Sequence, residues 1–333
     1  MIVGLPQLPY AKSASEETDQ LSLRCSIGIM AYNEEGNISR LLAALVSQRT
    51  TKVTLGEILV VASGCTDGTE SIVHEWEGRD PRIRLLVQTS REGKAAAVNE
   101  FLRQAREKVM VLCSGDLLPE PDAIEQVLAP FADPEVGMTT ARPLPVNDPE
   151  TFTGFAAHML WGLHHQLNQT GQFKAGELIA FRKIFERIPY RTAVDEASIE
   201  PVIRGQGYRA VYVPTAVVHN KGPETLDDFL RQRRRIYAGH LSIRDTLGYS
   251  VSTMSGWKIL GLVLRRLDWR PRSFLWTWAV VALEVYGRLL GQRDYKRRRD
   301  HTVWEIAKTT KELGTELSNA EARAASVGGR AFL

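Results

Sequence analysis

Residues 25–35 read CSIGIMAYNEE, a short apolar run that ends abruptly in polar residues. Runs of this length and character are typical of strands buried in a sheet. Four such runs predict strands: Cys25–Met30, Glu57–Ala62, Arg82–Gln88 and Lys108–Cys113. Between them, apolar residues three and four positions apart predict helices over Asn37–Ser47, Gly68–Glu77 and Ala95–Glu107. This alternation predicts an α/β fold with a mostly parallel sheet and helices on both faces.

The pattern continues to about Val218 and then changes. Asp122–Phe131 predicts a further helix, and Gly207–Val218 predicts a strand pair or one strand with a turn at Pro214. After Asp227 the strand-like runs stop, and the sequence becomes helical in character and rich in Arg and Trp. We therefore expect an N-terminal extension (1–22), an α/β domain (23–230), a basic Trp-rich helical region (231–317) and a flexible tail (318–333).

Composition places the chain among folded globular proteins, with 333 residues, 44% of them hydrophobic and 24% charged. Its cysteines, Cys25, Cys65 and Cys113, form no paired spacing for disulfides or zinc, which favours a reducing compartment. The first residues lack the basic start and apolar run of a signal peptide. The longest apolar stretch near the C-terminus, 274–283, is shorter than the roughly 20 residues of a spanning helix.

Charge is distributed unevenly along the chain. The segment 231–300 contains 16 Lys or Arg against 5 Asp or Glu, whereas the whole chain has a net charge of +3, so the remainder is net acidic. A basic segment attached to an acidic domain indicates an anionic partner such as phosphate, phospholipid or nucleic acid.

Polar residues follow each predicted strand at the edge where ligands bind in an open parallel sheet. Tyr32 and Asn33 follow the first strand and suit a nucleotide base, although Asn33 could instead cap the next helix. Lys94 follows Gly93 at a predicted helix N-terminus, where an anion would be held. Asp116 emerges directly from a buried strand, and one carboxylate together with diphosphate oxygens commonly binds Mg²⁺ or Mn²⁺.

Seven segments in order carry a resemblance: MAYNEE, VASGCTDGT, REGKAAAVN, SGDLLPEP, GELIAFRK, VDEASIE with GYRAVYVP, and QRRRI. Over roughly Leu23–Gly239 the chain resembles the family 2 glycosyltransferases, which have the GT-A fold. Each segment is modest alone, whereas seven in the right order and spacing are specific.

The resemblance implies a set of site residues. Asp195 matches the catalytic base, and Asp116 matches the metal ligand of the Asp-x-Asp motif, with Ser114 replacing the first acid. Ser63 stands where many members have an Asp that reads uracil, and Ile236 replaces the Trp of the Gln-x-x-Arg-Trp motif. The implied donor-binding residues are Ala31, Tyr32, Asn33, Glu34, Ser63, Lys94, Ser114 and Gly115. Those implied for the diphosphate and acceptor are Gly176, Glu177, Glu196, Gln232, Arg233 and Arg235.

The implied reaction is a single in-line displacement that inverts the anomeric carbon. The implied donor is a nucleotide-diphosphate sugar, with UDP favoured over GDP or dTDP, and the implied cofactor is Mg²⁺ or Mn²⁺. We expect the acceptor to be a saccharide, most simply a lipid-linked one used in cell-surface polysaccharide or glycolipid synthesis.

The C-terminal region indicates where in the cell the protein is located. Tryptophans alternate with Lys and Arg over 257–272, and a helix from Phe274 has a broad apolar face. Trp and Arg together suit the headgroup layer of a bilayer, and Lys296–Arg299 would add attraction to anionic lipid. We therefore expect a cytoplasmic protein held on the inner face of the membrane. The alternative is a helical subdomain packed on the α/β domain or on a second copy.

Three other functions have some support in the sequence. A sugar nucleotidyltransferase would need a Gly-rich loop with a basic residue after the first strand, which MAYNEE lacks. A nucleic-acid-binding protein is disfavoured by the acidic α/β part and the absence of a known module. An inactive scaffold is suggested by Ser63 and Ser114, but Asp116 and Asp195 are retained.

Overall fold

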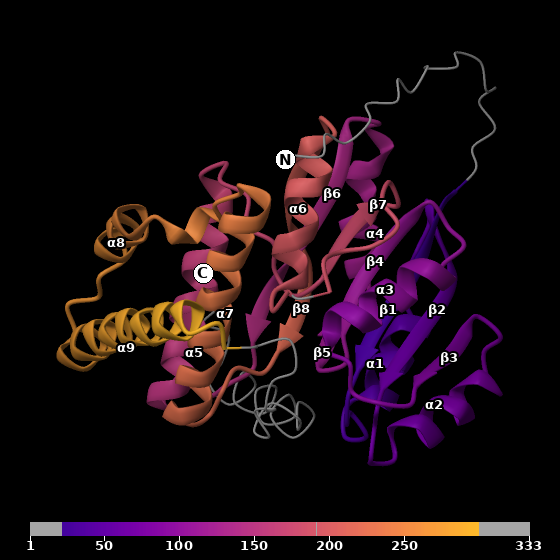
Figure 1. Cartoon of the computed structure of the whole chain (residues 1–333), viewed down its shortest axis with the longest axis horizontal. Helices are drawn as coiled ribbons and strands as arrows, with labels where there is room; N and C mark the ends of the chain where they lie inside the picture. Colours follow the sequence, from indigo (N-terminus) through magenta and orange to yellow (C-terminus); the bar gives the residue numbers. More distant parts are fainter. Residues whose placement is uncertain (1–21, 191, 300–333) are drawn as a thin grey trace, which may run out of the picture.

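The computed structural model describes residues 22–190 and 192–299. An eight-stranded sheet in the order β3-β2-β1-β4-β7-β6-β8-β5 has helices on both faces, and further helices gather at one end (Figure 1). The expected flexible tail, residues 300–317 of the expected helical region and all but Ser22 of the expected extension lie outside the described residues.

The first half of the sheet is parallel. Its elements are β1 (Leu23–Ala31), α1 (Ile38–Val46), β2 (Val53–Ser63), α2 (Thr69–Glu77), β3 (Ile83–Gln88), α3 (Lys94–Gln104) and β4 (Val109–Ser114). β1 pairs in parallel with β2 and β4, and β2 pairs in parallel with β3. The four strands and three helices predicted here are confirmed. Because the strands are parallel, the loops that follow them meet at one edge of the sheet.

The second half is mixed. Its elements are β5 (Leu117–Pro119), α4 (Ala123–Leu128), the 3-10 helix η1 (Ala129–Ala132), β6 (Val136–Pro145), α5 (Phe152–Gln169), β7 (Ile179–Arg182), α6 (Asp195–Gly205) and β8 (Arg209–Asn220). β7 runs antiparallel to both β4 and β6, and β5 runs antiparallel to β8. The prediction of a strand pair or a turn at Pro214 is wrong. β8 is one strand that bulges opposite β6 between Tyr212 and Val217, where a proline is tolerated.

Two apolar layers sandwich the sheet. On one face, Ile38, Leu42 and Ile124 from α1 and α4 pack on Ile27 and Ile29 of β1. On the other face, residues of α3 and α6 such as Phe101 and Ile199 pack on β2, β4 and β7. A Cβ at Gly28 would lie 2.6 Å from the Phe101 ring, so only glycine lets α3 approach β1 this closely.

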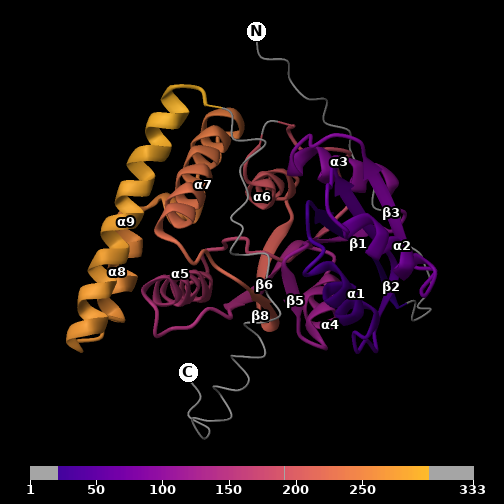
Figure 2. The ribbon, with the colours of Figure 1, turned by 90° about the horizontal axis from the view of Figure 1, so that it is seen from below.

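The C-terminal helices are those that gather at one end of the sheet (Figure 1). They are α7 (Leu226–Leu247), the 3-10 helix η2 (Ser252–Met254), α8 (Gly256–Arg265) and α9 (Pro271–Lys296). α7 and α9 lie side by side (Figure 2). Their close approach depends on Gly291, where a Cβ would lie 2.7 Å from the Arg234 carbonyl oxygen, and on an ion pair between Arg234 and Asp294. The expected boundary at 230 falls inside α7, and α5, which the sequence did not predict, packs with α8 and α9.

Candidate active site

A cavity of about 720 Å³ joins the two parts of the fold. It begins at the C-terminal ends of β1, β2 and β4 and extends between α5, α7 and α9. The predicted site residues that line it are Ala31, Tyr32, Glu34, Ser63, Lys94, Ser114, Gly115, Asp116, Gly176, Glu177, Asp195, Glu196, Gln232, Arg233 and Arg235. Residues predicted from segments far apart in the sequence therefore share one cavity.

Asn33 is the exception among the predicted residues, since it does not line the cavity. Its backbone has a φ of 51°, the left-handed conformation that Asn tolerates better than most residues. Its side chain accepts a hydrogen bond from the Thr66 backbone N–H at 2.9 Å and donates one to Thr66 Oγ1 at 3.1 Å. Asn33 thus joins the loop after β1 to the loop after β2.

Close contacts shape the nucleotide end of the cavity. The Arg91 guanidinium stacks 4.0 Å from the centre of the Tyr32 ring, and both side chains line the cavity. A Cβ at Gly115 would lie 2.6 Å from Glu34 Cγ, so the middle position of Ser114-Gly115-Asp116 requires glycine. Ser63 is 5% exposed, and its Oγ has no hydrogen-bond partner in the part of the chain that the structure describes.

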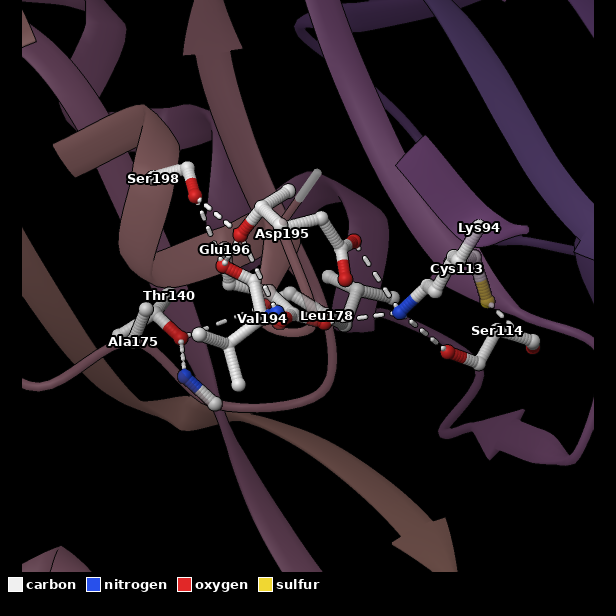
Figure 3. A network of polar contacts seen from close by, with 12 residues as sticks. Lys94, Cys113, Ser114, Thr140, Ala175, Leu178, Val194, Asp195, Glu196 and Ser198 are labelled. Atoms are coloured by element: carbon white, nitrogen blue, oxygen red, sulfur yellow. Dashed lines mark hydrogen bonds and ion pairs between the residues drawn. The ribbon is translucent and has the colours of Figure 1, made fainter. Parts of the chain in front are cut away.

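Lys94 lies at the centre of a polar network (Figure 3). It is the first residue of α3, immediately after Gly93, whose φ of 92° favours glycine. Its Nζ donates to Glu196 Oε1 at 2.9 Å and to Ser114 Oγ at 3.3 Å, and lies 3.1 Å from Asp195 Oδ2. Lys94 therefore connects the strand-end loops to the first turn of α6.

Asp195 and Glu196 are adjacent acids with different electrostatic behaviour. Asp195 is 4% exposed, and burial followed by the Glu196 charge raises its pKa above the usual range of an aspartate. Burial also opposes the charged form of Glu196, but the charge and hydrogen bond of Lys94 outweigh it, so the pKa of Glu196 is lowered. Asp195 is consequently the better proton acceptor of the two at neutral pH.

Two further acids, Asp116 and Glu177, line the cavity. Burial, and then the charge of Asp116, raises the pKa of Glu177 to about 7. Over residues 22–190 and 192–299, no group of three His, Cys, Asp or Glu side chains could hold a metal ion alone. The oxygen donor of Asp116 suits Mg²⁺ or Mn²⁺, but such an ion would need additional ligands from a bound molecule.

The basic segment of α7 supplies the wall opposite the strand ends. Arg235 lies near Asp195, Glu196 and Glu177, although burial lowers its pKa. Arg233 donates to Gln232 Oε1 at 3.0 Å and lies 3.9 Å from Glu284 Oε2 of α9. Arg235 therefore faces the acids of α6 and of the loop before β7, whereas Arg233 contacts α9.

Several lining residues were not predicted from the sequence. They are Arg91, Trp161, His164, Lys174, His240, Glu284 and Arg288. Arg91 belongs to a segment recognised in the sequence and could have been found there. The others come from α5, its following loop, α7 and α9, where neither strand-end position nor motif spacing marks them.

Comparison with known proteins gives the family. The sequence model described as glycosyl transferase family 2 matches residues 26–200, and that of glycosyl transferase family group 2 matches residues 201–292. Dolichol-phosphate mannosyltransferase of Mycosarcoma maydis is 30% identical over 108 residues, which is 31% of this chain and 37% of that protein. Poly-beta-1,6-N-acetyl-D-glucosamine synthase of Staphylococcus aureus is 23% identical over 219 residues, 62% of this chain and 52% of that one. The chain thus spans about a third to a half of these relatives.

The fold has a solved counterpart. The mannosyltransferase PcManGT of Pyrobaculum calidifontis, solved in complex with GDP-Man and Mn²⁺, superposes with a TM-score of 0.54 at 21% identity, covering 92% of this chain and 88% of that one. This likeness confirms the predicted GT-A fold. Since the first family model alone covers more than half of the sequence, the chain belongs to the family 2 glycosyltransferases.

Proposed function

We propose that this protein is a metal-dependent, inverting glycosyltransferase that moves a sugar from a nucleoside-diphosphate donor to a hydroxyl of a lipid-linked acceptor. The observation that carries the proposal is the position of Asp195. This buried carboxylate lies where the strand-end loops of the first half meet the helices of the second half, inside one cavity. A donor on one side and an acceptor on the other would both reach it.

Asp195 is proposed as the general base. As the acceptor oxygen bonds to the anomeric carbon, its proton passes to the carboxylate, while the bond from that carbon to the diphosphate oxygen breaks. The raised pKa of Asp195 brings it closer to neutral pH, which suits a base. Lys94, 3.1 Å away, keeps the carboxylate charged and oriented before reaction.

The leaving diphosphate gathers negative charge. Asp116 and the oxygens of the diphosphate would hold a divalent cation, and that cation would supply Lewis-acid stabilisation when bound. Arg235 lines the same cavity and adds a fixed positive charge whose planar fork suits phosphate. Tyr32 and Ser63 are proposed to contact the nucleotide, because both line the end of the cavity at β1 and β2.

The donor is proposed to be a UDP-sugar, with GDP- and dTDP-sugars as alternatives. PcManGT was solved with GDP-Man and Mn²⁺, which supports a nucleotide sugar together with a divalent cation. Ser63 can accept or donate a hydrogen bond, so this position does not itself select one base.

Residues 231–299 are the described part of the expected membrane-associated region. We propose that their helices lie on the cytoplasmic face of a membrane. By length and composition α9 could cross a membrane, but only 22% of its most apolar window is buried in the protein, and its C-terminal half packs beside the charged helix α7. A surface position suits this arrangement better than a spanning one. The large apolar residues that α9 exposes are Leu275, Trp278, Val285, Tyr286 and Leu289.

Neighbouring elements also expose large apolar side chains. Trp257 of α8 is 85% exposed and Trp269, between α8 and α9, is 78% exposed. Large apolar side chains this exposed commonly mark an interaction surface. Trp276, by contrast, packs edge-on against Phe152 and Phe155 of α5, so it supports the fold.

The experiment is a donor screen. Purified protein is incubated with UDP-, GDP- and dTDP-sugars, with and without Mn²⁺, in the presence of anionic liposomes that contain polyprenyl-phosphate-linked acceptors. We expect one nucleotide to support sugar transfer or slow donor hydrolysis, and Mn²⁺ to stimulate it. If no nucleotide sugar binds under any condition, the protein is an inactive relative and the proposal fails.

A further inference from the structure

We propose that the part of the cavity beyond Asp195, called here the far arm, is an anion-binding subsite that holds a phosphate group of the acceptor through Lys174 and Arg288. The far arm lies between α5, α7, η2, α8 and α9, away from the strand-end loops. The inference rests on the proposed function only in treating this arm as the acceptor side.

The far arm has a polar end and an apolar wall. Lys174, His240, Glu284 and Arg288 line the polar end. The wall consists of Ala157, Leu160 and Trp161 from α5 with Met254 and Ile259 from η2 and α8. A ligand that fits both parts carries a charged group attached to an apolar or sugar-like body.

Three cations gather around the polar end. Glu284, which lines it, lies 3.2 Å from Arg288 Nε and 3.9 Å from an Arg233 terminal nitrogen. Lys174 adds a third cation close enough to act on His240 together with Arg233 and Arg288. After burial, these three charges lower the pKa of His240, so its imidazole is neutral. On its other side Lys174 also faces Glu196, Glu200 and Glu177.

Buried hydrogen-bonding capacity remains unused in the far arm. His240 is 5% exposed, and its Nε2 has no hydrogen-bond partner among the described residues, nor does Arg233 Nε. The hydrogen bond that the structure gives the Lys174 ammonium, which has three donors, is to the Ala175 carbonyl oxygen at 3.2 Å. Unpaired buried polar groups destabilise a protein, so a ligand that supplies acceptor oxygens would relieve this cost.

The donor geometry favours phosphate. An ammonium, a guanidinium and a neutral imidazole converge from three different elements, and a phosphate presents several oxygens to meet them. This site is distinct from the donor's diphosphate, which is assigned to Asp116 and Arg235. Lys94, Asp195 and Glu196 form an ion-paired cluster that lines the same cavity.

The test uses the full-length protein and calorimetric titration with a short-chain alkyl phosphate, the matching neutral alcohol and inorganic phosphate. Lys174→Gln and Arg288→Gln are the test variants. Arg293→Gln is the matched control, because Arg293 is an exposed arginine of α9 that does not line the cavity. We expect alkyl phosphate to bind the wild type about tenfold or more tightly than the alcohol, and each test variant to lose about tenfold in affinity for it. Arg293→Gln should keep wild-type affinity.

The two phosphate probes identify the source of the anion. Preference for alkyl phosphate over inorganic phosphate supports a lipid phosphate, and equal binding supports a soluble phosphate-bearing acceptor. Equal binding of alkyl phosphate and alcohol to the wild type overturns the subsite, whatever the variants' folding.

Unchanged alkyl-phosphate affinity in both folded variants also overturns it. Nucleoside-diphosphate affinity, measured in parallel, should stay at the wild-type level in Lys174→Gln and Arg288→Gln. A failed donor screen with charge-dependent alkyl-phosphate binding would leave the subsite standing and reject the proposed transfer.

Discussion

The two ends of the cavity differ in how they are built. At the strand-end loops the backbone sets the geometry. Lys94 Nζ there lies 3.1 Å from Asp195 Oδ2 and 2.9 Å from Glu196 Oε1. In the far arm, side chains from separate elements set the geometry, and Lys174, Arg233 and Arg288 surround His240. The difference indicates that the acids of the first end are already ion-paired, whereas the far arm keeps buried donors such as Arg233 Nε open to a ligand.

Removing the proposed base tests the first end most severely. Asp195→Asn keeps the size of the side chain but removes its basicity, so transfer should fall by about 10²–10⁴-fold. Donor affinity should change little, because the base acts on the acceptor. Radiolabelled sugar transfer and nucleotide titration measure the two quantities separately. Equal losses of donor affinity and turnover would remove Asp195 from the base role.

Asp116→Ala should weaken donor binding by roughly 10–100-fold, as expected for the loss of a contact to a charged group. It should also abolish stimulation by Mn²⁺, and EDTA should inhibit the wild type. Asp122→Ala is a suitable control, since Asp122 is exposed and does not line the cavity. Wild-type transfer that EDTA leaves intact would show that the side chains alone stabilise the leaving group.

The pH dependence of kcat/KM should report the buried carboxylate at the junction. Asp195 must be deprotonated to act, and its pKa is raised by burial and by Glu196, against the opposing charge of Lys94. kcat/KM should therefore fall about tenfold per pH unit on the acidic side of an inflection above the ~3.9 of a free aspartate. Nucleotide affinity over the same range serves as the control. An inflection at or below that value would contradict the raised pKa.

The smallest effect concerns the membrane face. Trp257→Ser with Trp269→Ser should weaken binding to anionic liposomes about tenfold, because each variant removes exposed apolar area that would enter the headgroup layer. Flotation measures this, and Val87→Ser, at a 52% exposed apolar position on β3, is the matched control. Wild-type protein that ignores liposomes of either charge would make this helical face a packing or dimerisation surface.

The same contrast explains how far the sequence could be interpreted. The parallel half was predictable because each strand is a continuous apolar run, and its loops carry Tyr32, Lys94 and Asp116 at fixed positions after the strands. β5, β6 and β7 were missed. β5 and β7 span only three and four residues, and the ten residues of β6 include Gly137, Arg142 and two prolines, which interrupt an apolar run.

The far arm could not be predicted at all. Lys174, His240 and Arg288 meet only through packing of α5, α7 and α9, which no local pattern encodes. Asn33 shows how a local backbone conformation orients a side chain after a strand. Its position after β1 suited a nucleotide contact, but the left-handed turn directs its side chain to Thr66.

The anomeric configuration of the product tests the central claim most directly. A single displacement assisted by Asp195 requires the transferred sugar to have the opposite configuration from the donor. With the donor identified by the screen, NMR of the product should show complete inversion. Retention of the donor's configuration would contradict a one-step reaction with Asp195 as the base.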